Sequence, residues 1–169
     1  MNRELIFEFE VDMDNVLIHV RKEFTASLEL VWRAYTDSEI LDKWWAPLPW
    51  KTQTKEMNFV EGGRWLYAMV GPEGEKHWSR ADYKRIKAGQ FFEASDAFCK
   101  NEEGEINEDF PRAEWKTSFE SRGDSLTLVE IRTRYTSKKD LEAVVQMGMK
   151  EGFTMALEQL EDLLSKPKA

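Results

Sequence analysis

The side chains with the greatest potential for chemistry in this sequence are two histidines and one cysteine. His19 and His77 lie far apart, and neither has Cys, Asp or Glu around it at the spacings that metal ligands usually show. Cys99 has no histidine nearby in the sequence and ends an apolar stretch, so we interpret it as a small buried hydrophobe rather than a nucleophile. No Gly-x-Ser-x-Gly motif or phosphate-binding loop occurs. The sequence therefore predicts no metal site, no cofactor and no assigned catalytic residue.

Three polar residues close together in the sequence are the remaining candidates for acid–base chemistry. Arg80, Asp82 and Tyr83 lie in one expected strand, where they could act as acid, base or anchor at the rim of an apolar hollow. Their spacing selects no particular reaction. A cyclase- or hydrolase-type enzyme is therefore kept as a hypothesis, ranked below a binding protein.

The elements that must position these residues begin with a half-buried strand and two short helices. Residues 15–24 alternate between apolar and polar side chains, which is typical of a strand with one buried face. Ser27 is expected to cap a helix over residues 28–36, because its side-chain oxygen can accept a hydrogen bond from a free amide of the first turn. A second helix is expected over 38–45, ended by Pro47 and Pro49.

The middle of the chain has a period of two and predicts an antiparallel meander. Short turns separate expected strands at 51–59, 64–70, 76–86, 90–99, 113–121 and 125–135. An apolar stripe over residues 138–165 then predicts one long helix of about 42 Å, which can lie across a seven-stranded sheet about 34 Å wide. We expect an α+β fold in which a curved seven-stranded antiparallel sheet surrounds a long C-terminal helix.

Composition limits the classes of function. The chain has 169 residues with 32 acidic and 24 basic side chains, a formal net charge of -8. We expect one domain spanning 1–169, with a core at about 15–165. The negative charge repels phosphate backbones, so nucleic-acid binding is not expected. No signal peptide or membrane span is recognised, and one cysteine permits a reducing compartment, so we expect a cytoplasmic protein.

Large aromatic side chains are the unusual feature of the composition. The chain has seven tryptophans and ten phenylalanines although only 41% of its residues are hydrophobic. Such rings can form a core of large residues, or they can line a space that binds an apolar ligand. For the second case, strand alternation and helix position predict a cavity of a few hundred Å³. Its expected ligand-binding residues are Trp45, Trp65, Tyr67, Met69, Trp78, Trp115, Phe119, Met149, Phe153 and Leu157.

Two pairs of residues carry specific expectations. Trp44 and Trp45 are adjacent on a helix, so their side chains point about 100° apart and only one of them can enter the same core. We expect the other to line the mouth of a cavity or an interface.

Gly148 and Gly152 each cost a helix about 1 kcal/mol relative to alanine, so a strand, loop or ligand is expected to approach the helix closely there.

Four ordered stretches resemble a known family. The first is FTASLELVWRAYTDSEILDKWWAP at residues 24–47; the others are EGGRW at 61–65, the positions Gly123 and Thr127, and GMKEGF at 148–153. Together they resemble bacterial proteins similar to the C-terminal domain of the activator of the heat-shock protein 90 ATPase. These proteins belong to the START-like, or SRPBCC, superfamily. The resemblance implies a helix-grip (START-like, Bet v 1-like) fold with an internal cavity.

The resemblance also implies three classes of function. Relatives bind lipids, hormones or polyketides, and some are cyclases, so the first hypothesis is an apolar or amphipathic small molecule bound in the cavity. The second is docking on a heat-shock protein 90 homologue. About fifteen residues precede the first expected strand, so we do not expect the separate docking domain of the eukaryotic activator. Weak homodimerisation through exposed aromatic residues such as Trp44 or Trp50 is expected to be more favourable than a chaperone complex.

Overall fold

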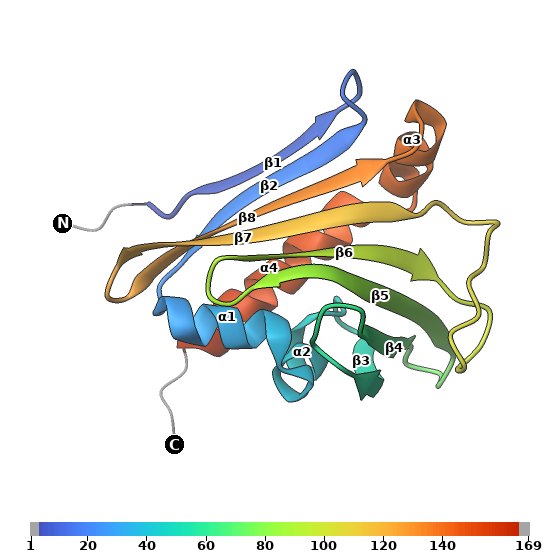
Figure 1. Ribbon diagram of the computed structural model, residues 1–169, viewed down its shortest axis with the longest axis horizontal. Coiled ribbons are helices and arrows are strands. Elements are labelled where there is room, and N and C mark those ends of the chain that lie inside the picture. The colour runs from blue at the N-terminus through green and yellow to red at the C-terminus, as the bar shows by residue number, and fades with distance from the viewer. Residues whose placement is uncertain (1–3, 166–169) are drawn as a thin grey trace.

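The computed structural model describes residues 4–165, which form one eight-stranded antiparallel sheet and four helices (Figure 1). The ends of the chain, 1–3 and 166–169, lie outside the described residues. The strand order in the sheet is β1-β2-β8-β7-β6-β5-β4-β3. The elements are β1 (Phe7–Asp12), β2 (Leu17–Phe24), α1 (Leu28–Thr36), α2 (Ser38–Trp44), β3 (Lys51–Met57), β4 (Arg64–Val70), β5 (Lys76–Lys87), β6 (Phe91–Phe98), β7 (Ala113–Gly123), β8 (Leu126–Tyr135), α3 (Lys138–Gln146) and α4 (Met149–Ser165).

The sheet has one strand more than the sequence analysis predicted. Residues 7–12 form the edge strand β1, which pairs with β2 in the register Phe9 to Val20. Its apolar side chains alternate with acidic ones, which is a strand pattern. Most of the strand is exposed, so the same residues also resemble a polar N-terminal segment without regular structure. Strand β2 begins later than expected, because the turn from β1 includes Val16 with a φ of 56°. The other strands lie close to their expected ranges.

Two short helices follow β2 at one end of the sheet, as the sequence predicts. The backbone N–H of Leu30 donates to the hydroxyl of Ser27, which caps α1, and the N–H of Glu39 donates to the carboxylate of Asp37, which caps α2. Side-chain oxygens therefore satisfy amides that a helix start leaves free. These caps fix where α1 and α2 begin, and the end of α2 places Trp44 and its neighbour Trp45 toward the interior of the molecule.

The C-terminal helical segment is divided into α3 and α4, so the prediction of one continuous helix over 138–165 is wrong. The N–H of Met147 donates to carbonyl groups of α3 and closes that helix. The next residue, Gly148, has a φ of +89°, a left-handed conformation that glycine adopts without the steric cost of a side chain. Helix α4 starts immediately afterwards. Gly148 is thus a helix terminator rather than a packing position within one helix.

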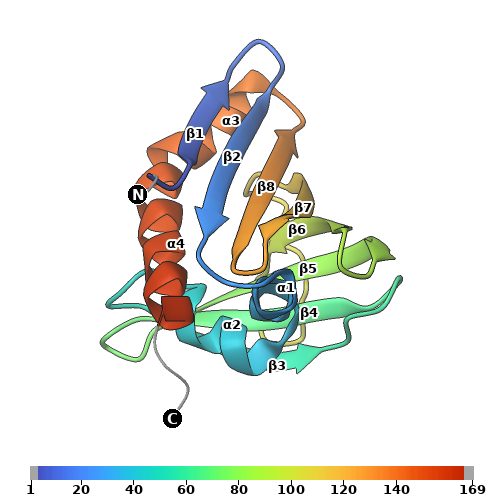
Figure 2. The same cartoon turned by 90° about the vertical axis from the view of Figure 1, so that its left-hand side faces the viewer.

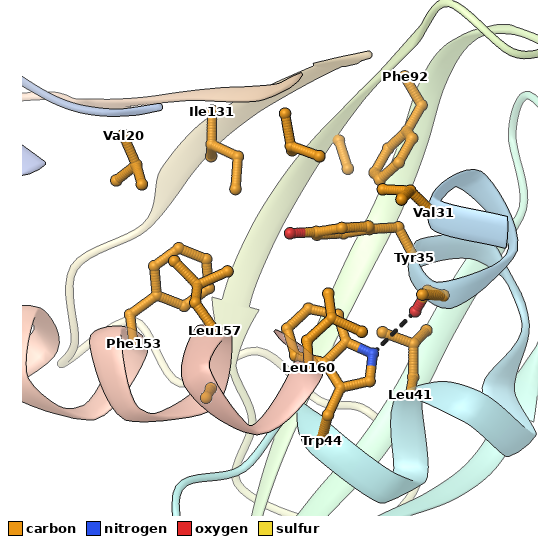
Figure 3. Close-up of a cluster of buried hydrophobic side chains, with 14 of the residues drawn as sticks. Val20, Val31, Tyr35, Leu41, Trp44, Phe92, Ile131, Phe153, Leu157 and Leu160 are labelled. Carbon is orange, nitrogen blue, oxygen red and sulfur yellow. Dashed lines mark hydrogen bonds between the residues drawn. The ribbon is translucent and has the colours of Figure 1, made fainter. Parts of the chain in front are cut away.

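The sheet curves around α4, and this arrangement confirms the predicted helix-grip α+β fold class (Figure 2). Val20 of β2 and Ile131 of β8 face Phe153 and Leu157 on α4 (Figure 3). The side chains of Leu157, Val20 and Ile131 are at most 2% exposed. Burying these apolar surfaces holds α4 to the concave face of the sheet.

Candidate functional site

A cavity of about 340 Å³ lies between the concave face of the sheet and the helices. Strands β4 to β8 supply most of its walls, and residues of α1, α2 and α4 close it on the other side. His77 and Met147 are exposed lining residues, so they mark the part of the cavity that reaches the surface. The mouth therefore lies beside the break between α3 and α4.

Most of the residues that the sequence predicts for a ligand site line this cavity. They are Trp45, Trp65, Tyr67, Met69, Trp115, Met149 and Phe153. The aromatic members touch one another: the ring centroid of Trp45 lies 5.5 Å from that of Trp65 and 5.8 Å from that of Phe153. Trp115 of β7 contacts both Trp45 and Phe153, so residues from the end of α2, β4, β7 and α4 build one continuous aromatic wall.

Three of the expected ligand-binding residues do not line the cavity, and each has a structural reason. Trp78 lies between His77 and Ser79 in β5; those two line the cavity, so alternation directs Trp78 to the opposite face. Phe119 is 8% exposed and packs in the core beyond the cavity, where its ring centroid lies 4.9 Å from that of Trp32. Leu157 is 1% exposed and belongs to the packed core of α4.

The adjacent tryptophans divide between core and cavity, as their positions on one helix predict. Trp44 is 1% exposed, and its indole N–H donates to the carbonyl oxygen of Ala34 at 2.9 Å (Figure 3). Trp45 lines the cavity, and its indole N–H donates to the hydroxyl of Tyr67 at 3.1 Å. Because Trp44 is buried, the expectation that it is an exposed contact for self-association is wrong.

Asp96 of β6 is the carboxylate that lines the cavity. Its Oδ2 accepts a hydrogen bond from the indole N–H of Trp115 at 2.7 Å, and its Oδ1 accepts one from the backbone N–H of Ala113 at 2.8 Å. Burial raises the pKa of Asp96 to about 6, and the neighbouring charge of Glu114 adds to this shift, whereas the two hydrogen bonds and Arg112 oppose it. The carboxylate therefore titrates much closer to neutral pH than an exposed aspartate does.

The alternation in β6 is a sequence signal that points to Asp96. Phe92, Ala94, Asp96 and Phe98 are spaced by two and share the face of β6 that lines the cavity. An aspartate in the middle of an apolar strand face has to be satisfied by non-local donors. The predicted strand over 90–99 is sufficient to raise this expectation.

All four tyrosines of the chain line the cavity: Tyr35, Tyr67, Tyr83 and Tyr135. Burial raises the pKa of each phenol, that of Tyr135 to about 12, so these side chains are neutral hydrogen-bonding groups at physiological pH. The hydroxyl of Tyr35 points from α1 toward the space between Ile131 and Phe153 (Figure 3). Among the described residues, no group hydrogen-bonds to this hydroxyl.

The acid–base candidates from the sequence separate in space. Tyr83 lines the cavity, whereas Arg80 and Asp82 pair with each other, Nε of Arg80 lying 2.9 Å from Oδ2 of Asp82. Arg80 also donates to the carbonyl oxygen of Gly104. Alternation along β5 directs this pair away from the cavity face. Arg80 and Asp82 thus form an ion pair that links β5 to the loop before β7.

The two histidines and Cys99 have separate surroundings. His19 hydrogen-bonds to Glu130 at 2.9 Å, and the ring of His77 packs against Trp50. Burial raises the pKa of the Cys99 thiol, which disfavours the reactive thiolate. Within residues 4–165, no cluster of three or more His, Cys, Asp or Glu side chains is arranged to hold a metal ion.

The family described as activator of Hsp90 ATPase homolog 1-like protein matches residues 25–165. The chain belongs to this family. The match confirms the resemblance that the sequence motifs indicate. A search of curated proteins gave no match. In the part of the chain that the structure describes, no helix is long and apolar enough to span a membrane.

Solved structures of similar proteins share the fold of this family member. A solution structure of a protein from Arthrobacter aurescens is 27% identical, with a TM-score of 0.88 and coverage of 95% of this chain and 92% of that chain. A crystal structure of a protein from Mycobacterium smegmatis is 26% identical, with a TM-score of 0.85 and coverage of 98% and 100%. An AHSA1 protein from Silicibacter pomeroyi is 16% identical, with a TM-score of 0.69 and coverage of 88% and 97%, which shows the fold alone.

Proposed function

We propose that this protein binds an apolar or amphipathic small molecule in the cavity between the sheet and α4, in the cytoplasm. The observation that carries the proposal is a cavity of about 340 Å³ walled by the rings of Trp45, Trp65, Trp115 and Phe153. Ligand pockets in proteins have volumes of this order, with mostly apolar walls and a few polar groups that orient the ligand. The family and the fold are compatible with a ligand-binding or an accessory role.

The hydroxyl of Tyr35 supports the same proposal. Tyr35 is 4% exposed, and its hydroxyl is without a hydrogen-bond partner among the described residues. A buried polar group without a partner costs on the order of 1 to 3 kcal/mol. Protein atoms cover this hydroxyl oxygen, so a ligand that displaces the side chains around it would recover that free energy by a hydrogen bond to Tyr35.

The test is an NMR titration of protein labelled with ¹⁵N, using the neutral probe 1-naphthalenemethanol. Saturable shifts are expected for the indole N–H signals of Trp45, Trp65 and Trp115, which line the cavity. The indole signal of Trp78 serves as an internal control, because this side chain lies on the face of β5 opposite the cavity.

A matched pair of variants distinguishes the cavity from the surface. Ala81→Phe places a ring in the cavity and is expected to abolish the shifts. Ala88→Phe makes the same replacement in the exposed turn between β5 and β6 and is expected to leave them unchanged. If no indole signal shifts in the wild type, or if both variants bind alike, this cavity is not the binding site.

Two alternative functions are each supported by one specific observation. Docking on a heat-shock protein 90 homologue is supported by the description of the family. An enzyme that uses the cavity is supported by Asp96, because a carboxyl with a pKa of about 6 is suited to general acid–base catalysis near neutral pH. Binding ranks first because it requires only the cavity and its walls, whereas each alternative requires a further partner or reaction.

A further inference from the structure

The charge of the cavity walls restricts the kind of ligand that fits. Asp96 is the carboxylate among the lining residues, and within the described chain no lysine or arginine lines the cavity. His77, at the mouth, is the other lining side chain besides the tyrosines that can change charge. A ligand carboxylate or phosphate would therefore enter without a cationic partner, next to a carboxylate of the same sign.

Asp96 has the hydrogen-bonding capacity to bind a donor from a ligand. An ionised carboxylate has about four lone-pair sites, and the N–H groups of Trp115 and Ala113 occupy one on each oxygen. Within residues 4–165, Asp96 forms no ion pair. The two protein donors hold the carboxylate in a fixed position, which reduces the entropy that a ligand would lose in binding to it.

The groups around Asp96 do not neutralise it. On the β7 side, Arg112 lowers its pKa and Glu114 raises it, so these two act in opposite directions. Glu114 is itself held by Lys84, at 2.8 Å, and by Ser95. Tyr67 on β4 and Tyr135 on β8 also sense the charge of Asp96, and both are neutral phenols. The carboxylate thus faces the cavity with its charge largely uncompensated.

The rings beside Asp96 add a second attraction for a cation. Trp115, which donates to Asp96, has its ring centroid 6.1 Å from that of Trp45 and 5.9 Å from that of Phe153. The faces of aromatic rings attract ammonium groups, more strongly when water is excluded. A protonated nitrogen that donates to Asp96 would therefore lie beside this group of rings.

We propose that the ligand of this cavity is an apolar amine, whose protonated nitrogen donates to the carboxylate of Asp96 while its apolar body packs against the aromatic wall. This inference rests on the proposed function, because it requires that the cavity binds a small molecule. It assigns Asp96 as the residue that selects ligand charge. It also disfavours fatty acids and other anionic amphiphiles as ligands.

The test compares three probes of the same shape and different charge: 1-naphthylmethylamine, 1-naphthalenemethanol and 1-naphthoic acid. Dissociation constants are measured by the indole NMR titration at pH 7.5. We expect the amine to bind about tenfold or more tightly than the alcohol, since a charge-assisted hydrogen bond is roughly twice as strong as a neutral one. The acid should bind most weakly.

Two carboxylates of strand β6 provide matched variants. Asp96→Asn removes the charge in the cavity and is expected to abolish the preference for the amine over the alcohol while alcohol binding persists. Glu93→Gln removes the same charge from the opposite face of β6, where Glu93 pairs with Arg85, and should leave the preference intact. A preference that survives Asp96→Asn overturns the inference.

The pH dependence of the wild type tests the inference without any substitution that could impair folding. The ratio of amine to alcohol affinity should fall as the pH decreases through about 6, because protonation removes the charge of Asp96. His77→Gln should keep this dependence, which separates Asp96 from the other titratable lining group. If the alcohol binds but the ratio is constant from pH 8 to pH 5, the inference fails and the proposed function stands. If none of the three probes binds, the proposed function itself fails.

Discussion

At the scale of single residues, Asp96 links folding to pH. Burial raises its pKa from the ordinary value of 3.8 to about 6, so between about pH 4 and 6 the folded protein retains a proton that the unfolded chain releases. The contribution of Asp96 to stability therefore falls as the pH rises through this window, by on the order of 2 kcal/mol. The free energy of unfolding of the wild type and of Asp96→Asn is measured with urea from pH 4 to pH 7.5. As the pH rises, the stability of the wild type should fall relative to that of the variant. A difference that does not depend on pH would contradict this.

Trp44 and Trp45 are neighbours in the sequence, but Trp44 lies in the core and Trp45 in the cavity wall. Substitutions of the two residues can therefore distinguish stability from binding. Trp44→Phe removes the donor to Ala34 in a fully buried site, so we expect it to lower the free energy of unfolding by about 1 to 3 kcal/mol with little effect on probe binding. Trp45→Phe removes the hydrogen bond to Tyr67 in the cavity wall. We expect it to weaken the affinity for the probe, with a smaller effect on the free energy of unfolding. Urea unfolding and the naphthalenemethanol titration on both variants decide this. Equal effects of the two substitutions on both measurements would refute the division between core and cavity.

At the scale of elements, the two glycines near the start of α4 should respond in opposite ways to alanine. Gly152 lies within α4, and an added Cβ would meet Cγ of Pro47 at an ordinary contact distance of 3.6 Å. Gly152→Ala should therefore stabilise the protein by about 1 kcal/mol through helix propensity. Gly148 has a φ of +89°, so Gly148→Ala should destabilise it by about 1 to 2 kcal/mol. Thermal unfolding of the pair checks the position of the helix break. If both substitutions stabilised the protein, a continuous helix would be the better description.

At the scale of the whole molecule, surface charge argues against tight binding to another acidic protein. The net charge is -8, and two residues of the basic run at 84–87 are already paired: Lys84 with Glu114 and Arg85 with Glu93. We therefore expect less than a several-fold stimulation of a heat-shock protein 90 ATPase when both proteins are at micromolar concentration. Lys138 and Lys139 are the exposed basic pair at the start of α3. A several-fold stimulation that is lost on replacing both with glutamate would support the docking alternative instead.

The sequence by itself determined those features that depend on neighbouring residues. Period-two alternation located β2 to β8, although the edge strand β1 was missed, and Ser27 marked the start of α1 because a cap acts within one turn. Tertiary structure decided the features that join distant segments. The carboxylate of Asp96 is held by hydrogen-bond donors on β7, and Trp45 donates to Tyr67 on β4. Such contacts depend on sheet order and curvature, which local periodicity does not encode.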